Sequence, residues 1–530
     1  MALWLRDVSL DWGEDESLLP HRVATLLGVA PSSISRLRVV RRSLDARRKP
    51  RLVKILTVEF SVDNEAQLLA RCSSQPRLQL APADELPVST RIAGRHRALV
   101  AGMGPAGLFA ALRLAECGAQ VTLVERGRPV ESRVRDVERF WADGTLNAES
   151  NVQFGEGGAG TFSDGKLSTR LNHPWLRYVL ATLVACGADE DLLVEAKPHI
   201  GTDRLRLVLI RFRERLKSLG VELRYETRLT GLELAGERLA GGVLNGSELC
   251  PCDSLVLAIG HSARDTYRML AESGVALAAK DFAVGVRVEH PRDLIDRIQY
   301  GAKPPLGVPA ADYALRYNDP DSGRGVYSFC MCPGGEVINS ASESGGVVVN
   351  GMSTAARGGA RSNSALVVTV RPADWPDATP LGGVEFQRRL EQAAYRAGGG
   401  GFIAPAQNLL AFAGSGRGPL PSSCRPGVRE ADLAAFLPGF VTSGLRRALP
   451  QFERQMRGFL TSEAVLVGVE SRTSAPLRIV RDEQGESLSH RGLFPAGEGA
   501  GYAGGIMSAA LDGLKVADRI VQRLCDGSPA

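Results

Sequence analysis

The sequence predicts an α/β fold built around a Rossmann-like dinucleotide-binding unit near residue 100. Three observations support this fold class. Gly102, Gly104 and Gly107 form a G-x-G-x-x-G motif between an apolar run and an Ala/Leu-rich segment. A second apolar run ends at Glu125, 18 positions after Gly107. The C-terminal segment at 492–525 again has the order strand, glycine-rich turn and long helix.

Each glycine of the motif has its own physical reason. Gly102 permits a tight turn after the strand expected at 97–101, and Gly104 lets the backbone approach a pyrophosphate. Gly107 lets the helix expected at 108–116 pack closely on that strand. The helix N-terminus offers free N–H groups and a partial positive charge to phosphates. The predicted cofactor contacts here are Gly102, Gly104, Pro105, Ala106 and Gly107.

The acidic residue after the second expected strand, 119–124, supports the same interpretation. Glu125 lies near the roughly 20-residue interval at which a carboxylate meets the ribose hydroxyls of a dinucleotide. We predict that Glu125 and its neighbour Arg126 bind the cofactor. An ordinary glycine-rich turn is the alternative, and the strands and helix expected around the motif disfavour it.

Bulk composition limits the class of protein. With 530 residues, 44% hydrophobic and 23% charged, the chain suits a globular protein of two to four domains. A net charge of +5 is too mild to imply a polyanionic partner. Nine irregularly spaced cysteines argue against a disulfide framework and for a reducing compartment. Early charges at the N-terminus and the lack of a long apolar run predict a cytoplasmic protein without a membrane span.

Changes in the expected pattern of strands, helices and loops divide the chain into four parts. We expect a small α+β domain at 1–92 and a nucleotide-binding domain assembled discontinuously from 93–285 and 461–530. An α+β substrate domain at 286–460 is expected between these two segments. Few aromatic residues interleave with the Arg/Lys-rich stretch 36–54, so a solvated basic hairpin is favoured there over a nucleic-acid patch.

Five strings of the chain are long enough to indicate a family. They are VQFGEGGAGTFSDGKL at 152–167, FCMCPGG at 329–335, VNGMS at 349–353, ESRTSAP at 470–476 and PAGEGAGYAGGIM at 495–507. These strings are similar to those of uncharacterised bacterial FAD-dependent dehydrogenases. That family belongs with the two-dinucleotide-binding-domain flavoproteins, which have a glutathione-reductase-like FAD fold. The resemblance covers nearly all of the chain beyond residue 90.

The resemblance implies FAD as the cofactor and a second set of contacts near the C-terminus. In such flavoproteins the acid of the terminal motif, here Glu498, hydrogen-bonds a ribityl hydroxyl. Backbone N–H groups near Gly505 and Ile506 would stabilise negative charge on the reduced flavin. A helix-cap or turn carboxylate is the alternative role for Glu498. The remaining expected contacts are Ala258, Gly260, Gly497 and Gly504.

The glycine-rich stretch 155–166 is the expected loop under the flavin. Its backbone N–H groups can approach a phosphate or a ring edge, so Gly157, Gly158, Gly160 and Thr161 are predicted cofactor contacts. Ser163, Asp164 and Lys166 are the candidate catalytic residues, and Lys166 would also contact the cofactor and stabilise the reduced anion. The alternative is a simple turn at Asp164 with a solvated lysine.

Other reactive side chains receive structural interpretations. Cys330 and Cys332 stand as C-x-C, whereas flavin-linked disulfide reductases usually use wider spacing. We expect these thiols to point apart, in a structural or substrate-pocket role. Cys250 and Cys252 repeat the spacing at an expected strand edge.

Two charged pairs alternate along expected strands, namely Arg287 with Glu289 and Glu470 with Arg472. Each is expected to be an interface ion pair rather than catalytic. Anchoring of an anionic substrate is the other role considered for Arg287 and Glu289. His261 is expected to cap a turn, and no metal-binding constellation stands out.

These expectations combine into a cytoplasmic FAD-dependent oxidoreductase that passes hydride or electrons through flavin N5 to or from a small molecule. The absence of a second G-x-G-x-x-G disfavours a separate nicotinamide domain but leaves NAD(P)H open as a transient donor. Two alternatives remain. One is a flavin-binding regulatory protein that contacts nucleic acid or a partner, and the other is a flavin enzyme without net redox change. The oligomeric state and the substrate stay open.

Overall fold

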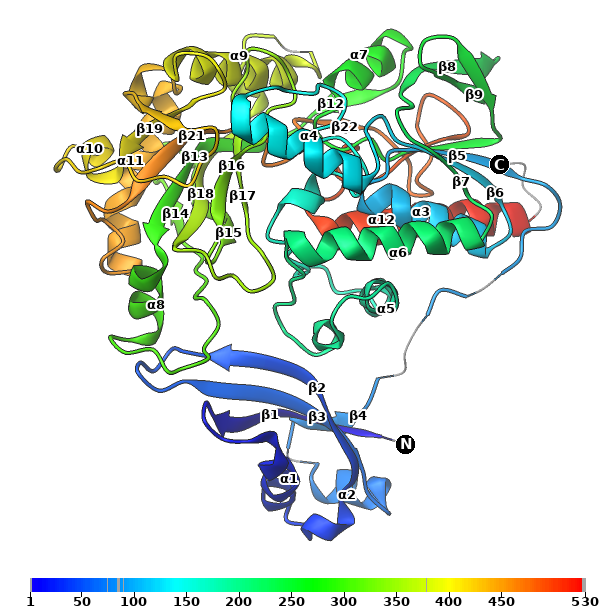
Figure 1. Ribbon diagram of the computed structural model, residues 1–530. Coiled ribbons are helices and arrows are strands. Elements are labelled where there is room, and N and C mark those ends of the chain that lie inside the picture. Colours follow the sequence, from blue (N-terminus) through cyan, green and yellow to red (C-terminus); the bar gives the residue numbers. More distant parts are fainter. Residues whose placement is uncertain (1, 74, 83–85, 89, 378, 527–530) are drawn as a thin grey trace.

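The computed structural model describes residues 2–73, 75–82, 86–88, 90–377 and 379–526. The outermost residues of the expected division, 1 and 527–530, lie outside these ranges. The largest sheets are a five-stranded parallel sheet and a seven-stranded mixed sheet, which occupy opposite sides of Figure 1. A four-stranded N-terminal sheet lies below both. The predicted α/β fold class is confirmed.

The N-terminal unit is an antiparallel sheet with two helices on one face. Its strand order is β2-β3-β1-β4, and buried side chains of β1 and β3 pack against α1 and α2. The bounds are β1 Leu3–Asp11, α1 Leu19–Leu27, β2 Ser35–Asp45, β3 Val53–Ser61, α2 Glu65–Arg71 and β4 Leu78–Leu80. This agrees with the α+β block expected there.

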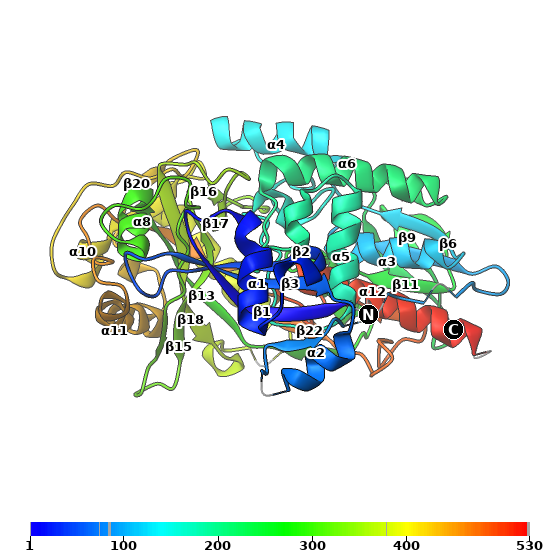
Figure 2. The ribbon, with the colours of Figure 1, turned by 90° about the horizontal axis from the view of Figure 1, so that it is seen from below.

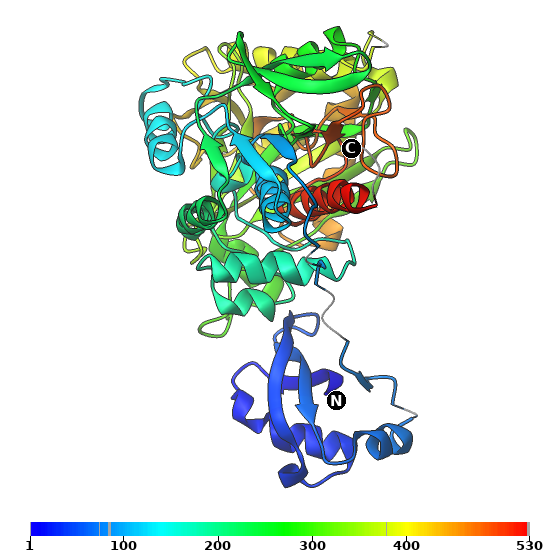
Figure 3. The ribbon, with the colours of Figure 1, turned by 90° about the vertical axis from the view of Figure 1, so that its right-hand side faces the viewer.

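The β2–β3 hairpin joins the N-terminal unit to both larger parts. Arg42 exchanges backbone hydrogen bonds with Val194 and Ala196, and Lys49 between the two strands donates to the Ile298 carbonyl. Trp12, just after β1, adds a bond from its ring N–H to the Leu306 carbonyl at 3.3 Å. In the view from below, this unit lies across the boundary between the two larger parts (Figure 2). Figure 3 shows it as a separate body at the end of an extended connection.

The parallel sheet draws its strands from four distant segments. Its order is β23-β11-β5-β6-β7, and helices cover the face formed by alternate side chains such as Ala98 and Val100. The strands are β5 Arg97–Ala101, β6 Gln120–Val124, β7 Glu222–Arg224, β11 Ser254–Leu257 and β23 Leu493–Pro495. The helices near this sheet are α3 Pro105–Glu116, α4 Val130–Asp143, α5 Trp175–Ala185, α6 Thr202–Ser218 and α12 Ile506–Cys525.

A smaller antiparallel sheet packs on the opposite face of the parallel sheet, where Leu99, Leu255 and Leu257 point. Its order is β10-β9-β8, and a two-stranded sheet of β12 and β22 lies nearby. The bounds are β8 Leu229–Ala235, β9 Arg238–Leu244, β10 Glu248–Pro251, α7 Arg264–Glu272, β12 Leu277–Ala279 and β22 Leu477–Ile479. The parallel sheet is therefore covered on both faces, as parallel sheets generally are.

The seven-stranded sheet has the order β14-β15-β18-β13-β21-β19-β20, in which only β19 and β20 pair in parallel. Apolar side chains of β13, β18 and β21 form a core with α8, α9 and α11. The strands are β13 Phe282–Pro291, β14 Arg316–Asn318, β15 Gly325–Cys332, β18 Arg361–Val370, β19 Ala404–Asn408, β20 Val428–Glu430 and β21 Val465–Glu470. The remaining elements are α8 Arg292–Tyr300, β16 Glu336–Asn339, β17 Val349–Met352, α9 Gly382–Ala397, α10 Leu409–Ala413 and α11 Gly439–Gln455.

The two large sheets take their strands from other chain segments than the expected domain division assigns to them. β13 spans the boundary set at 285, and β21 pairs with β13 and β19 although 461–530 was expected in the nucleotide-binding part. After β21, the chain returns to the parallel sheet at β23, and α12 follows β23. In the described part of the chain, no helix, α12 included, has the length and apolar character needed to cross a bilayer.

Candidate functional site

A cavity of about 820 Å³ lies where the parallel sheet meets the seven-stranded sheet. One end is lined by the β5–α3 turn, and the other by β14 and β15. This volume is within the range of about 300–1,000 Å³ typical of ligand pockets. Most predicted cofactor contacts line it, namely Gly102, Gly104, Pro105, Ala106, Glu125, Arg126, Gly158, Gly160, Lys166, Ala258, Gly260, Glu498, Gly504, Gly505 and Ile506.

The β5–α3 turn forms the expected dinucleotide cradle. A Cβ on Gly102 would overlap the Ala258 carbonyl oxygen, and a Cβ on Gly107 would overlap that of Gly102. Gly107 therefore serves helix packing and does not line the cavity. α3 begins at Pro105 without a side-chain cap, so its first N–H groups are available to a phosphate.

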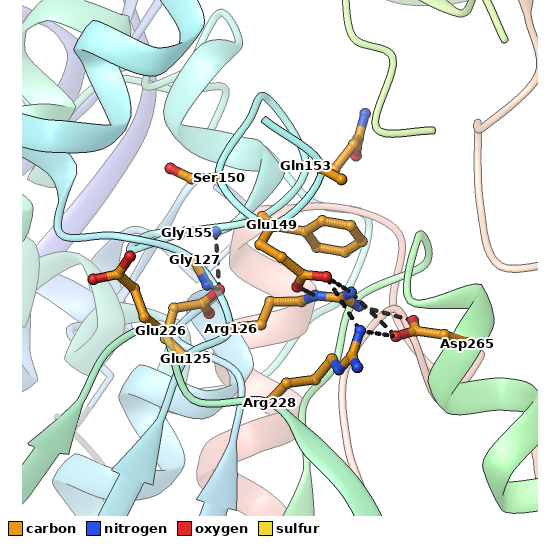
Figure 4. Close-up of polar contacts among 12 residues, drawn as sticks. Glu125, Arg126, Gly127, Glu149, Ser150, Gln153, Gly155, Glu226, Arg228 and Asp265 are labelled. Carbon is orange, nitrogen blue, oxygen red and sulfur yellow. Dashed lines mark hydrogen bonds and ion pairs between the residues drawn. The ribbon is translucent and has the colours of Figure 1, made fainter. Parts of the chain in front are cut away.

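The Glu125 carboxylate positions the backbone that is expected to contact the adenosine end of the cofactor. Its Oε2 accepts the Met103 N–H, and its Oε1 accepts the N–H groups of Gly127 and Gly155, each at 2.9 Å. Figure 4 shows the last two bonds. The carboxylate thus joins the glycine motif to the loop at 155–166 and still lines the cavity. One of its oxygens has a single donor, which leaves it able to accept a ribose hydroxyl.

Arg126 is held in the cavity wall by two carboxylates. Its guanidinium lies 2.7 Å from Glu149 and 2.8 Å from Asp265, and it stacks on the Phe154 ring at 4.1 Å. Arg228 contacts the same two acids at 3.2 and 3.3 Å, as drawn in Figure 4. Arg126 therefore presents a flat, neutralised surface to the cavity rather than a free positive charge.

The loop at 155–166 approaches the glycine motif, but not all its residues face the cavity. A Cβ on Gly158 would lie 3.0 Å from Gly104 Cα, which shows how closely the two backbones pass. Gly157 donates its N–H to the Met103 carbonyl at 2.8 Å, and Thr161 is buried. Gly157, Thr161 and Gly107 do not line the cavity, so their contact with a cofactor stays a prediction.

A buried arginine that the sequence pattern did not single out holds this loop. Arg133 of α4 donates to the carbonyls of Asn151, Val152 and Glu156 at 2.8, 2.9 and 2.7 Å. It is fully buried. An arginine on an amphipathic helix usually faces water, so the sequence carries no signal for this role.

The three candidate catalytic residues lie together at the cavity wall. Lys166 Nζ lies 2.8 Å from Asp164 Oδ2, and Arg357 Nε donates to Asp164 Oδ1 at 3.0 Å. Ser353 donates to Asp164 as well, while the Ser163 hydroxyl donates to the Gly160 carbonyl at 2.7 Å. Burial would raise the pKa of Asp164, but the charges of Lys166 and Arg357 outweigh burial and hold that pKa below its usual range. Asp164 is therefore an ionised anchor for Lys166.

The C-terminal motif reaches the cavity from the opposite side. Glu498 lines the cavity, and no hydrogen bond to its carboxylate is found among the described residues. Burial raises the pKa of this carboxyl to about 7, against the charge of Lys280. α12 begins after Gly505 without a side-chain cap, and a Cβ on Gly504 or Gly505 would meet open space. Gly497 instead donates its N–H to Asp512 and does not line the cavity, so its contact with the cofactor stays a prediction.

His261 follows Gly260 at the cavity edge. Its Nδ1 lies 2.9 Å from the Ser262 hydroxyl. Burial and the charges of Arg472 and Arg264 lower the pKa of His261 to about 4, so the ring is neutral at pH 7.

The two charged pairs expected along strands form different partnerships. Arg287 of β13 pairs with Glu470 of β21 at 2.9 Å across adjacent strands. Arg472 pairs with Glu391 of α9 at 2.7 Å, and Glu289 accepts the Ser423 N–H at 3.1 Å. Neither expected pair forms within itself: Arg287 and Arg472 form ion pairs with acids from other segments, and Glu289 accepts hydrogen bonds from serines instead. Strand alternation specifies a face and not a partner.

The Cys330 and Cys332 thiols do not point apart as expected. The β15–β18 register shifts between Phe329 and Cys332, and Cys330 has a φ of +45°. At this bulge the Cys332 thiol donates to the Cys330 carbonyl oxygen at 3.4 Å. Cys330 lines the cavity together with Glu498 and Lys166.

The far end of the cavity is formed by residues that the sequence did not mark. It is lined by Ser168, Thr169, Arg170, Arg316, Tyr317, Asn318, Tyr327, Ser328 and Phe329. These belong to the edge of the seven-stranded sheet and to the segment after Lys166. A sheet edge facing a cavity is a property of topology, so no local motif could predict it.

These residues fit FAD. Two uncapped helix N-termini face one cavity, which is large enough for a dinucleotide and which open positions at Gly504 and Gly505 extend. An unpaired carboxylate at Glu498 suits a ligand hydroxyl.

Comparison with known proteins agrees with this fit. The family model described as FAD binding domain matches 97–169, and the one described as FAD-dependent protein, C-terminal domain-like, matches 281–473. A domain of unknown function matches 6–61. An uncharacterized protein of Clostridium beijerinckii is 42% identical over 532 residues, which cover 99% of each chain.

Solved structures are similar only at a low level. A triple mutant of a flavin-dependent brominase is 12% identical with a TM-score of 0.36, covering 81% of both chains. A geranylgeranyl bacteriochlorophyll reductase-like protein from Thermoplasma acidophilum is 13% identical with a TM-score of 0.36, covering 82% of this chain and 81% of that one. Likeness of this degree has no bearing on the activity. From the matched family models and the Clostridium relative, this chain belongs to the same family as that relative and is an FAD-dependent flavoprotein.

Proposed function

We propose that the protein is an FAD-dependent oxidoreductase, of the dehydrogenase or reductase type, whose small-molecule substrate binds in the far end of the cavity. The observation that carries this proposal is the continuity of the cavity. A single cavity is lined both by the glycine motif and by β14 and β15, which lie at one side of the seven-stranded sheet. A protein that only stored or sensed FAD would need no such space beyond the cofactor.

The chain's own residues have distinct tasks in this proposal. The N-terminus of α3 binds the pyrophosphate, Glu125 and Arg126 form the adenosine end, and Glu498 receives a ribityl hydroxyl. When bound, the flavin supplies an acceptor and donor of hydride at N5.

Lys166 and the first turn of α12 place positive charge where negative charge develops on reduction. Burial opposes the charge of Lys166, but the neighbouring acidic groups, which are the Cys330–Cys332 pair and Asp164, raise the pKa of Lys166 above its usual value. Lys166 therefore stays protonated at neutral pH. Asp164, itself held by Arg357, fixes the lysine in the cavity wall.

Transfer of hydride in a dry site needs a wall that excludes water. His261, Glu470 and Arg472 line the cavity, and the two ion pairs Arg287–Glu470 and Arg472–Glu391 lie in its wall where the two sheets meet. None of these ion pairs is free to contact bulk water, because each is nearly fully buried. The electrostatic effect of Lys166 is correspondingly stronger than at a surface.

Anaerobic reduction tests the proposal. The purified holoprotein is mixed with NADH, with NADPH and with a library of small metabolites, and the visible flavin absorbance is followed. Bleaching by one of these donors, followed by recovery on adding an acceptor, is the expected result. Turnover of a compound without any bleaching would instead indicate a flavin enzyme with no net redox change.

A regulatory role through nucleic acid has weaker support. Basic side chains of the N-terminal hairpin are already paired, with Arg38 at 2.6 Å from Glu59, Arg42 at 3.0 Å from Glu16 and Arg47 at 2.6 Å from Asp45. Pairing of this kind reduces the charge available to phosphates.

A further inference from the structure

We propose that Cys330 and Cys332 form a dithiol–disulfide couple in the cavity wall, which exchanges two electrons with the bound flavin. The couple itself is independent of the proposed function, whereas the exchange with flavin rests on it. The inference is based on the backbone geometry of β15, on the surroundings of the two thiols, and on a matched C-x-C pair elsewhere in the chain.

The bulge in β15 gives Cys330 and Cys332 an arrangement that a regular strand does not allow. In an extended strand, residues two apart have Cα atoms about 6.6–6.8 Å apart, at the upper limit for a disulfide. Here Cys330 adopts a φ of +45°, and the pairing with β18 skips from Phe329 to Cys332. The Cys332 thiol donates to the Cys330 carbonyl oxygen, which lies 3.4 Å from Sγ.

Positive groups surround this pair on the protein side. Arg287 Nη1 lies 3.8 Å from Cys332 Sγ, and Nη1 and Nη2 each donate to the Cys330 carbonyl at 3.2 Å. Lys166 contacts the carbonyl of Met331, between the two cysteines. Glu470, the partner of Arg287, is also buried beside them. A backbone conformation that is unusual for a residue other than glycine is thus held in place by two cations.

The charge state of the pair suits thiol exchange. The hydrogen bond from Cys332 is the main reason why the pKa of Cys330 falls to about 5; burial opposes this, and Arg287 and Lys166 add to it. The pKa of Cys332 is raised by the same hydrogen bond. One thiolate beside one thiol is the arrangement from which disulfide formation begins.

The pair also faces the cofactor end of the cavity. Cys330 lines the cavity, and its charge acts on both Lys166 and Glu498. These two residues are the ones assigned to the flavin from the two distant halves of the site. The thiolate of Cys330 therefore lies on the cavity side, and Cys332 lies behind it as the buried second sulfur.

The chain contains a control with identical spacing. Cys250 in β10 and Cys252 just after it are not at a bulge, and Cys252 lies outside the cavity. Burial raises the pKa of both thiols, that of Cys252 to about 12. Spacing is shared by the two pairs, so any difference in redox behaviour comes from the bulge and the cations.

The proposed step balances without a further reagent. Oxidation forms one S–S bond between Cys330 and Cys332 and releases two electrons, together with the proton of the Cys332 thiol and any proton on Cys330. The oxidised isoalloxazine takes up the two electrons and at least one proton. In reverse, the reduced flavin returns both electrons and the disulfide opens to the dithiol.

Differential alkylation tests the couple without using flavin as a readout. The holoprotein is equilibrated with reduced and oxidised glutathione in different ratios, quenched with acid, alkylated with N-ethylmaleimide after unfolding, and digested with trypsin. The peptide 325–357 contains only Cys330 and Cys332, and the peptide 239–264 contains only Cys250 and Cys252. We expect an internal disulfide in peptide 325–357, which is then two hydrogen atoms lighter and carries no N-ethylmaleimide. At the same glutathione ratios, peptide 239–264 should still be alkylated at both cysteines. Parallel behaviour of the two peptides, or glutathione adducts on 325–357 instead of an internal disulfide, would refute the couple.

Reductive titration tests the exchange with flavin. Pre-oxidised wild-type holoprotein should consume two molar equivalents of dithionite per flavin, whereas C330S and C332S should consume one. The double variant C250S/C252S should behave as wild type. If peptide 325–357 contains an internal disulfide but the wild type consumes only one equivalent of dithionite per flavin, the exchange with flavin is refuted. The dithiol–disulfide couple is then still supported. A protein that folds but never binds flavin would refute the proposed function, and the alkylation result would still decide the couple.

Discussion

Gly513 of α12 packs directly against the backbone of Ala106 in α3, so closely that a Cβ at position 513 would overlap the Ala106 carbonyl oxygen. Farther along the same two helices, Arg113 and Asp518 form a buried ion pair at 2.5 Å. The two helices whose N-termini line the cavity are thus fixed to each other by residues more than 400 positions apart in sequence. This contact sets the geometry of the whole site.

Replacing Gly513 with alanine should therefore disturb both stability and cofactor binding. The new methyl group meets backbone, which cannot move aside, so we expect a loss of about 1–3 kcal/mol in the free energy of unfolding and weaker FAD binding. Denaturant unfolding and FAD titration measure the two effects. Gly439→Ala in α11, where a Cβ has open space, is the matched control and should change neither. Normal FAD affinity in Gly513→Ala would show that the contact between helices does not position the site.

Glu125→Gln tests the carboxylate that joins the glycine motif to the loop at 155–166. An amide nitrogen must face at least one of the three backbone N–H donors, because both oxygens of Glu125 are in use. We expect a loss of about 1–3 kcal/mol of stability and reduced FAD affinity. Glu226→Gln is the control. Glu226 lies close to Glu125 (Figure 4), but its carboxylate forms its ion pair with the exposed side chain of Arg128. Equal effects of the two substitutions would argue against this role of Glu125.

Glu498 predicts a pH dependence of the protein freed of FAD. Its carboxyl has a pKa of about 7 in the fold, against 4.5 for the ordinary group, because burial disfavours the charge. Protonated Glu498 is favoured in the folded state, so this contribution is fully present below about pH 4.5 and is lost as the pH rises through about 7. Relative to Glu498→Gln, the wild type should lose about 1–3 kcal/mol of stability between about pH 5 and about pH 8. A constant difference across that range would contradict a buried, titrating carboxyl.

Lys166→Met tests the cation at the flavin end. Removing the charge should lower the reduction potential of the bound flavin and slow its reduction by about 100-fold, while FAD remains bound. Lys166→Arg should restore much of both properties. Lys197→Met removes a surface lysine that pairs with Asp312 and should have no effect. Unchanged potential in Lys166→Met would place the lysine in a purely structural role.

Local features of the fold could be predicted from the sequence where short-range rules determine them. The strand at 97–101 and the strand expected at 119–124, seen at Gln120–Val124, follow from apolar runs. The helix expected at 108–116 ends as predicted but begins three residues earlier, at Pro105, because proline suits the first helical position. The C-terminal strand, turn and helix were predicted for the same reason. The glycine motifs near residue 100 and near the C-terminus line the cavity, as most of the residues predicted to bind the cofactor do.

Long-range partnerships could not be predicted from the same patterns. Alternation placed Arg287 and Glu289 on one strand face, yet their partners, Glu470 and Ser423, come from distant segments. The bulge at Cys330 and Cys332 depends on pairing with β18, which no local rule specifies. The expected domain boundaries remain predictions, although β21 lies in the seven-stranded sheet.

FAD titration of two glycine variants tests the central claim most directly. Gly104 and Gly504 stand in opposite segments of the chain, and a Cβ on either has room when no ligand is present. Gly104→Leu and Gly504→Leu should fold with near wild-type stability, and each alone should abolish the 1:1 binding of FAD that wild type shows. Retention of wild-type FAD affinity by either variant would contradict the conclusion that both segments hold one cofactor.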